Sequence, residues 1–144
     1  MLVRLLLVVA IVVAMALVGA WWQRRDGQVV SSDGRFRSDH LDAVGLLGLN
    51  GVGVALLLGT PTCSPCVTVK QILAEVVDER PDFRWVYADA ADHLDIADAH
   101  HVMRVPTLFV LDHGGRILAR TSGVPAKRDL LRVLDREGEL DPAA

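Results

Sequence analysis

The chain of 144 residues contains two cysteines, Cys63 and Cys66, which are separated by Ser64 and Pro65. A dithiol at this spacing can exchange bonds with a disulfide of another protein: one thiolate attacks, and the second cysteine releases the mixed disulfide that forms. The pair follows an apolar run at 54–58 and precedes apolar residues that recur at helical spacing within 69–77. We therefore predict that the cysteines lie where a buried strand is followed by a helix.

This predicted position gives the two cysteines different roles. The start of a helix carries unpaired N–H groups and the positive end of the helix dipole, which favour a thiolate over a thiol. We predict that Cys63, at the helix start, is the nucleophile, and that Cys66, one turn further in, is the more buried resolving thiol. An inert structural disulfide stays open as an alternative. A zinc site is disfavoured, because structural zinc takes four ligands and no second cysteine pair is present.

The N-terminus is strongly apolar and raises the apolar fraction of the chain to 51%. Residues 5–22 contain no charge and would form a helix about 27 Å long, close to the thickness of a bilayer core. We predict a single-pass membrane anchor at 1–22, with Trp21 and Trp22 at the interface. A cleaved signal peptide is the alternative. The count of Lys and Arg on either side favours a cytoplasmic position for the remaining chain, and an extracytoplasmic position stays open.

The remaining chain divides into a linker at 23–40, a domain at 41–137 and a polar tail at 138–144. Within the domain, the patterns predict a strand at 83–88, a weaker helix at 94–102 and a strand that begins at Val105-Pro106-Thr107. A Gly-Gly hairpin turn at 113–115, an antiparallel strand at 116–120 and a closing helix follow. This order predicts an α/β fold, a mixed central sheet with helices on both faces.

These features together resemble the thioredoxin-like superfamily over about residues 52–135. The residues that carry the resemblance are Cys63-Ser64-Pro65-Cys66 at the junction of strand and helix, Val105-Pro106-Thr107, the Gly-Gly hairpin and Gly123.

The resemblance implies a thioredoxin-like fold and a thiol–disulfide oxidoreductase. It also implies that Pro106 is a cis-proline beside the cysteines and that the backbone of Val105 pairs with an extended substrate segment. The implied substrate-binding surface is completed by Thr62, Ser64 and Pro65. The implied partners are protein disulfides, with an electron-donating reductase or a membrane dithiol carrier.

Three positions depart from the thioredoxin pattern. Thr62 stands where the family has a tryptophan, Ser64 stands where it has a glycine, and Leu57 stands where thioredoxins keep a buried acidic residue. Without that carboxylate, the proton of Cys66 must leave through water or the departing sulfur. We therefore predict a specialised, membrane-tethered protein disulfide reductase. A non-catalytic docking module with the same fold is the alternative.

Other chemistries have little support in the sequence. The formal net charge of −3 and the absence of a basic aromatic face argue against nucleic acid as a partner. His93, His100, His101 and the aspartates at 89, 92, 95 and 98 are interpreted as solvated or capping residues. His40 falls in the linker and His113 in a turn. No cofactor and no metal are therefore predicted.

Overall fold

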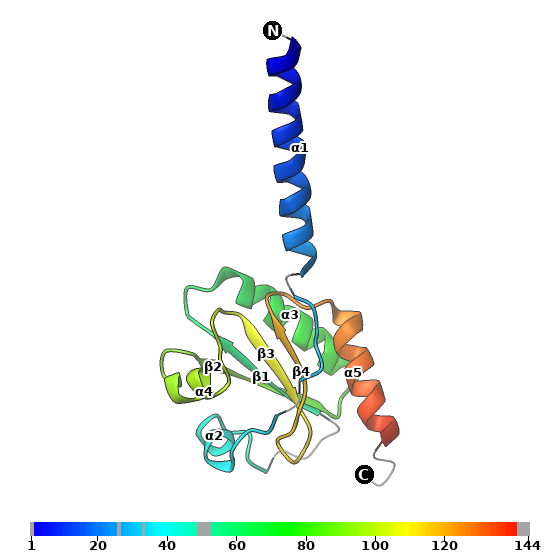
Figure 1. Cartoon of the computed structure of the whole chain (residues 1–144). Helices are drawn as coiled ribbons and strands as arrows, with labels where there is room; N and C mark the ends of the chain where they lie inside the picture. The colour runs from blue at the N-terminus through cyan, green and yellow to red at the C-terminus, as the bar shows by residue number, and fades with distance from the viewer. Residues whose placement is uncertain (1, 26, 33, 49–52, 141–144) are drawn as a thin grey trace.

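The computed structural model describes every residue except 1, 26, 33, 49–52 and 141–144 (Figure 1). The elements in chain order are α1 (Leu2–Arg25), α2 (Ser38–Ala43), β1 (Gly53–Gly59), α3 (Ser64–Glu79), β2 (Phe83–Asp89), α4 (Leu94–Ala99), β3 (Thr107–Leu111), β4 (Ile117–Ser122) and α5 (Lys127–Leu140). α2 begins at Ser38, inside the segment predicted as a linker at 23–40. Part of the predicted polar tail is helical, because α5 runs through Leu140, and the rest lies outside the described residues.

The four strands form one mixed sheet in the order β2-β1-β3-β4. β1 pairs with β2 in parallel, and the β1–β3 and β3–β4 pairs are antiparallel. Every residue of β1 is buried, because this strand lies inside the sheet and is covered on both faces. The predicted α/β fold with a buried strand before the cysteines is therefore confirmed.

Two apolar layers cover the sheet. On one face, α3 and α5 pack on alternate residues of β1 and β3 through a set comprising Val69, Leu73, Val76, Leu130 and Leu134. On the other face, Ile96 of α4 packs with residues that flank α2, among them Phe36, Val44 and Leu46. The alternation of β1 side chains between these two layers fixes its register, because a slip by one residue would exchange the two faces.

Apart from residue 33, the segment at 27–36, predicted as part of a linker, lies along the outer edge of β4. Val30 exchanges two backbone hydrogen bonds with Arg120, at 2.9 and 2.8 Å. Further along, the N–H of Ile117 donates to the carbonyl of Gly34, and the N–H of Phe36 donates to the carbonyl of Gly115. The segment thus satisfies backbone groups that an edge strand would otherwise leave unpaired.

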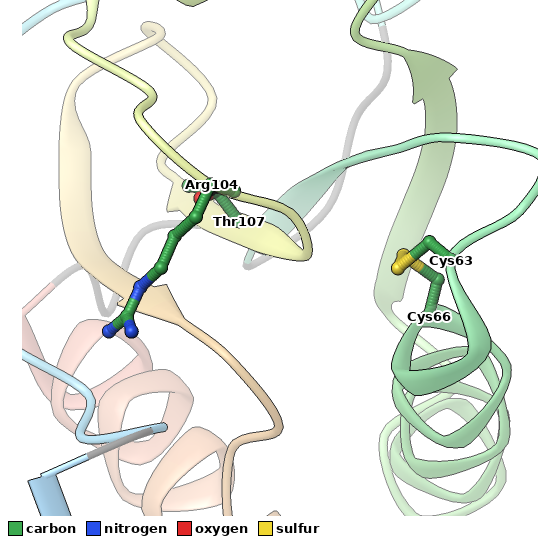
Figure 2. Close-up of a disulfide and its surroundings, with 4 residues drawn as sticks. All are labelled: Cys63, Cys66, Arg104 and Thr107. Atoms are coloured by element: carbon green, nitrogen blue, oxygen red, sulfur yellow. Dashed lines mark hydrogen bonds between the residues drawn. A yellow bond between two sulfur atoms is a disulfide. The ribbon is translucent and has the colours of Figure 1, made fainter. Parts of the chain in front are cut away.

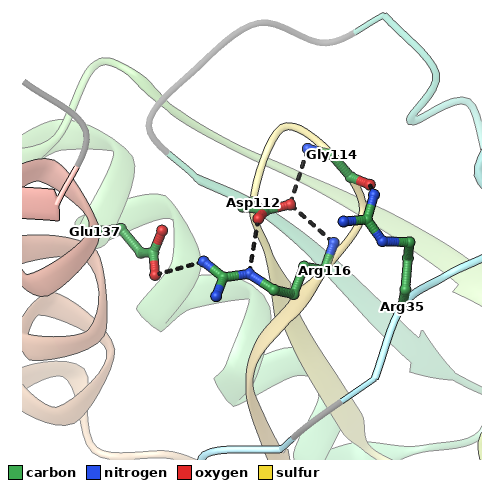
Figure 3. Close-up of polar contacts among 5 residues, drawn as sticks. All are labelled: Arg35, Asp112, Gly114, Arg116 and Glu137. Carbon is green, nitrogen blue, oxygen red and sulfur yellow. Dashed lines mark hydrogen bonds and ion pairs between the residues drawn. The ribbon is translucent and has the colours of Figure 1, made fainter. Parts of the chain in front are cut away.

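The β3–β4 hairpin is closed by a carboxylate network around Asp112 (Figure 3). Its Oδ1 accepts hydrogen bonds from the N–H groups of Gly114 and Arg116, both at 2.8 Å, and its Oδ2 lies 3.1 Å from Nε of Arg116. Burial alone would raise the pKa of Asp112, but the hydrogen bonds from Arg116 and Gly114 outweigh it and lower that pKa. Arg35 donates to the carbonyl of Gly114 at 2.8 Å, so the segment at 27–36 is attached here too.

The predicted single-pass membrane location is wrong: among the helices of the described residues, none combines the length and apolarity needed to cross a bilayer. α1 extends away from the sheet (Figure 1). Because that location is wrong, the predicted membrane orientation and the predicted anchor at 1–22 are not retained.

Candidate active site

The two cysteines lie at the start of α3, as the sequence predicts. Cys63 occupies the N-cap position of α3 in an extended conformation, and Cys66 lies in the first turn. Their sulfurs form a disulfide, with a Cα–Cα distance of 5.4 Å. Cys66 is buried, with 3% of its surface exposed, whereas Cys63 is half-buried. The sulfur of Cys63 is therefore the one that a partner protein reaches more easily.

The electrostatic surroundings of Cys63 favour a thiolate in the reduced state. A helix start leaves N–H groups without carbonyl partners inside the helix. In the first turn of α3 the N–H of Cys66 donates to the carbonyl of Cys63 at 3.2 Å, and no acidic residue occupies that turn. The positive end of the helix dipole is thus not offset by a carboxylate of the helix itself. Pro65 is compatible with this turn because it lies at the beginning of the helix, where a missing N–H removes no helical hydrogen bond.

The Val105–Pro106 bond is cis, as the resemblance predicts. Thr107, the next residue, begins β3 and pairs with Leu58 near the end of β1, from which the chain continues to Cys63. The proline and the cysteines are therefore at the same end of the sheet. Figure 2 shows the disulfide facing the segment that carries Arg104 and Thr107, with the Arg104 guanidinium directed away from the sulfurs.

The residues predicted to bind substrate differ in their exposure. Thr62, Ser64 and Pro65 are exposed next to the disulfide, Val105 is half-buried and Pro106 is buried. The exposed residues leave the Cys63 side of the disulfide open to a partner.

Leu57 and Gly59 of β1 lie on the buried side of the site. Leu57 is fully buried and packs in the layer formed with α3, so no carboxylate occupies the position where thioredoxins keep one. Gly59 lies against Cys66: a Cβ at this position would be 2.8 Å from Sγ of Cys66 and 2.8 Å from Cε2 of Tyr87. The ammonium group of Lys70 lies over the ring of Tyr87, 3.7 Å from the ring centroid. Gly59 is therefore needed for the close approach of the strand to the disulfide.

A Gly59→Ala variant is expected to lose about 1–3 kcal/mol of unfolding free energy, because the added methyl overlaps its neighbours. The loss should be larger in the oxidised protein, where the bond to Cys63 restrains the Cys66 sulfur. Denaturant unfolding of both redox states measures the difference. Gly19→Ala is the control, since a Cβ there meets no atom within 4 Å. Equal losses in the two states would contradict a clash with the sulfur.

Within the described part of the chain, no three His, Cys, Asp or Glu side chains are grouped so that they could hold a metal ion. His100 instead stacks on the ring of Phe36, with the ring centroids 3.8 Å apart.

The sequence did not reveal the contacts that hold the cis-proline segment. The N–H of Gly123 donates to the carbonyl of Pro106 at 2.8 Å, and the Oγ atoms of Thr107 and Ser122 are 3.3 Å apart. Arg120 also reaches this segment, and in the sequence it is one of two arginines in the strand predicted at 116–120. The hairpin register would have placed Ser122 opposite Thr107, but nothing in the sequence indicated the direction of the Arg120 side chain.

Comparisons with known proteins agree with this geometry. No family model matches the chain. It is 35% identical over 77 residues to NADPH-dependent thioredoxin reductase 3 of Arabidopsis thaliana, covering 53% of this chain and 14% of that protein. It is 33% identical over 52 residues to the thioredoxin of Mycoplasma genitalium, covering 36% and 51%. The chain thus spans about half or less of the length of these curated relatives.

Solved structures show the same fold. Mitochondrial thioredoxin 3 from Saccharomyces cerevisiae, in its oxidised form, matches with a TM-score of 0.54 at 20% identity, covering 66% of this chain and 87% of that one. Chloroplastic thioredoxin z matches with a TM-score of 0.57 at 16% identity, covering 76% and 97%. The chain therefore has a thioredoxin-like fold.

Proposed function

We propose that the chain reduces disulfides in other proteins with the dithiol of Cys63 and Cys66. The observation that carries the proposal is the unequal environment of the two sulfurs. Cys63 is half-buried at the N-cap of α3, whereas Cys66 is buried one turn further in and within bonding distance of Cys63. An accessible, activated nucleophile and a sheltered resolving thiol are the two parts that exchange requires.

The reaction proceeds by two displacements at sulfur. In the first, the Cys63 thiolate attacks a sulfur of the partner's disulfide, so that a mixed disulfide forms and the other partner sulfur leaves as a thiolate, which takes up a proton. In the second, Cys66 loses its proton and attacks the Cys63 sulfur. The Cys63–Cys66 disulfide forms and the partner leaves with both cysteines reduced. Two electrons have passed from the chain to the partner.

Reduction is the favoured direction because the reduced form has little local stabilisation beyond the helix start. A strongly stabilised thiolate makes a dithiol pair oxidising. The residues between the cysteines, Ser64 and Pro65, carry no positive charge that would add such stabilisation. A reductase that also works by thiol–disulfide exchange would return the Cys63–Cys66 disulfide to the dithiol after each cycle.

The cis-proline segment supplies the substrate-binding backbone in this proposal. Val105 precedes Pro106 at the end of the sheet that carries the cysteines, and an extended substrate segment would pair with its backbone as an added strand. Thr62, Ser64 and Pro65 would form the surface on the other side of the substrate disulfide.

The test is reduction of insulin by the chain of residues 1–144, with dithiothreitol as the electron donor. Insulin precipitation is expected to begin earlier than with dithiothreitol alone, in proportion to the concentration of the chain. If the chain binds insulin but does not accelerate reduction, the fold acts as a docking module and the proposal fails.

A further inference from the structure

The segment at 100–106 joins α4 to β3 and carries the Val105–Pro106 bond. Its first two residues are held by one side chain of the sheet. Nη1 of Arg120 donates to the carbonyl oxygen of His100 at 2.7 Å, and Nη2 donates to that of His101 at 2.8 Å. Arg120 therefore links β4 to the point where α4 ends and this segment begins.

The position of Arg120 is itself fixed on two sides. Its backbone exchanges two hydrogen bonds with Val30, in the segment that covers the edge of β4. Its guanidinium lies over the ring of Phe109, with Cζ 5.2 Å from the ring centroid. A planar guanidinium with donors in a fixed fork suits two successive carbonyls, which the single ammonium of lysine matches less well.

The far end of the segment is held by the continuation of the same strand. The N–H of Gly123 donates to the carbonyl of Pro106, and Oγ1 of Thr107 donates to the carbonyl of Arg104 at 2.7 Å. Oγ of Ser122 lies 3.3 Å from Oγ1 of Thr107. Both ends of the segment at 100–106 are thus held by β4 or the residue that follows it. Arg120 holds the start, Ser122 and Gly123 hold the end, and Val105 lies between them.

We infer that Arg120 is a positioning residue for disulfide exchange with proteins: it sets the path of the segment that presents the backbone of Val105 to a substrate. This inference rests on the proposed function. Arg120 acts through His100 and His101, and its guanidinium has no part in the exchange of sulfur bonds. The guanidinium lies over Phe109, whereas α3 packs on the opposite face of the sheet, so we expect the chemistry of Cys63 to be independent of Arg120.

This division predicts an effect that depends on the substrate. A protein disulfide must pair with the Val105 backbone before its sulfurs are aligned with Cys63. A small aromatic disulfide such as 5,5′-dithiobis(2-nitrobenzoic acid) needs only the exposed sulfur. Misplacing a positioning element by about 1 Å costs up to about 100-fold in rate. Loss of the Arg120 contacts should therefore slow protein substrates and spare the small one.

The experiment compares Arg120→Met with Arg120→Lys in the chain of residues 1–144. For Arg120→Met, kcat/KM for insulin should fall about 10- to 100-fold, while the reaction of the reduced chain with the small disulfide stays within about twofold. Arg120→Lys should recover part of the loss, because an ammonium can still donate to one of the two carbonyls. Arg128→Met, at an exposed position of α5, is the matched control and should leave both reactions unchanged.

A spectroscopic readout reports directly on the contact. Burial lowers the pKa of His100, and the neighbouring charges of His40, Arg120 and His101 lower it further. Removing the guanidinium in Arg120→Met should therefore raise this pKa, as followed by NMR titration of the imidazole, with a smaller change in Arg120→Lys.

The outcomes distinguish failure of the proposed function from failure of the positioning role of Arg120. An inactive wild-type chain in both assays would overturn the proposed function. An active wild type in which Arg120→Met slows both substrates equally, or neither, would overturn the positioning role alone.

Discussion

A Cys63→Ser variant is expected to reduce insulin no faster than dithiothreitol does alone. Serine is a far weaker nucleophile than a thiolate at neutral pH, so the first displacement cannot occur. Cys66 cannot replace Cys63, because it is buried in the first turn of α3, with 3% of its surface exposed. The measurement is the initial rate of insulin reduction at equal concentrations of wild type and variant.

Cys66→Ser is the matched control for this prediction. It keeps the accessible sulfur and loses only the release step, so it should attack once and then stop. One equivalent of partner thiol should appear rapidly. After that, insulin should be reduced no faster than by dithiothreitol alone. If Cys63→Ser retained more activity than Cys66→Ser, the roles assigned to the two sulfurs would be reversed.

The second large effect is expected at Leu57, where a Leu57→Asp variant should lose at least about 4 kcal/mol of unfolding free energy at pH 7. Leu57 is fully buried against Val69 and Leu73 of α3. The substitution removes this packing and places a carboxyl group in an apolar layer, where burial raises its pKa in the folded state.

The pH dependence of that loss follows from the direction of the shift. A carboxyl whose pKa is raised by folding binds its proton more tightly in the folded chain. The penalty is therefore smallest below the unfolded pKa of about 3.9 and grows as the pH rises towards the folded pKa, by about 1.4 kcal/mol per unit. Above the folded pKa it is constant.

Leu57→Asn is the control, because it introduces a polar group of similar size that does not titrate. Urea unfolding between pH 4 and 7 gives the unfolding free energy of each variant. The contributions of the other titrating groups are the same in both variants and cancel when the two free energies are subtracted. That difference should grow with pH. Parallel profiles would show that the introduced carboxyl reaches solvent and that the layer around Leu57 is not closed.

Much of this arrangement could be predicted from local sequence patterns. The continuous apolar run before the cysteines predicted a strand buried on both faces, and β1 is such a strand. Helical spacing after Cys66 predicted α3, and the Gly-Gly turn predicted the β3–β4 hairpin. The cis bond before Pro106 followed from the resemblance and is present. These features depend on residues close together in the chain or on a recognisable motif.

The rest depends on long-range contacts that leave no local pattern. The segment at 27–36 is rich in polar residues and glycine, which predicts a linker, yet its backbone pairs with β4. Backbone hydrogen bonds to an edge strand require no particular side chains, so composition does not reveal them. Arg120 joins residues nearly twenty positions away in the chain through carbonyl oxygens, which have no sequence signature.

The most direct test of the central claim is the site of the mixed disulfide. Reduced Cys66→Ser is mixed with insulin, quenched with acid and analysed by peptide mass spectrometry. An insulin chain bonded to Cys63 is expected, and the reciprocal Cys63→Ser variant should carry none on Cys66. No adduct at Cys63, or equal adducts at the two positions, would contradict the claim that an exposed sulfur at the start of α3 attacks partner proteins and a buried neighbour releases them.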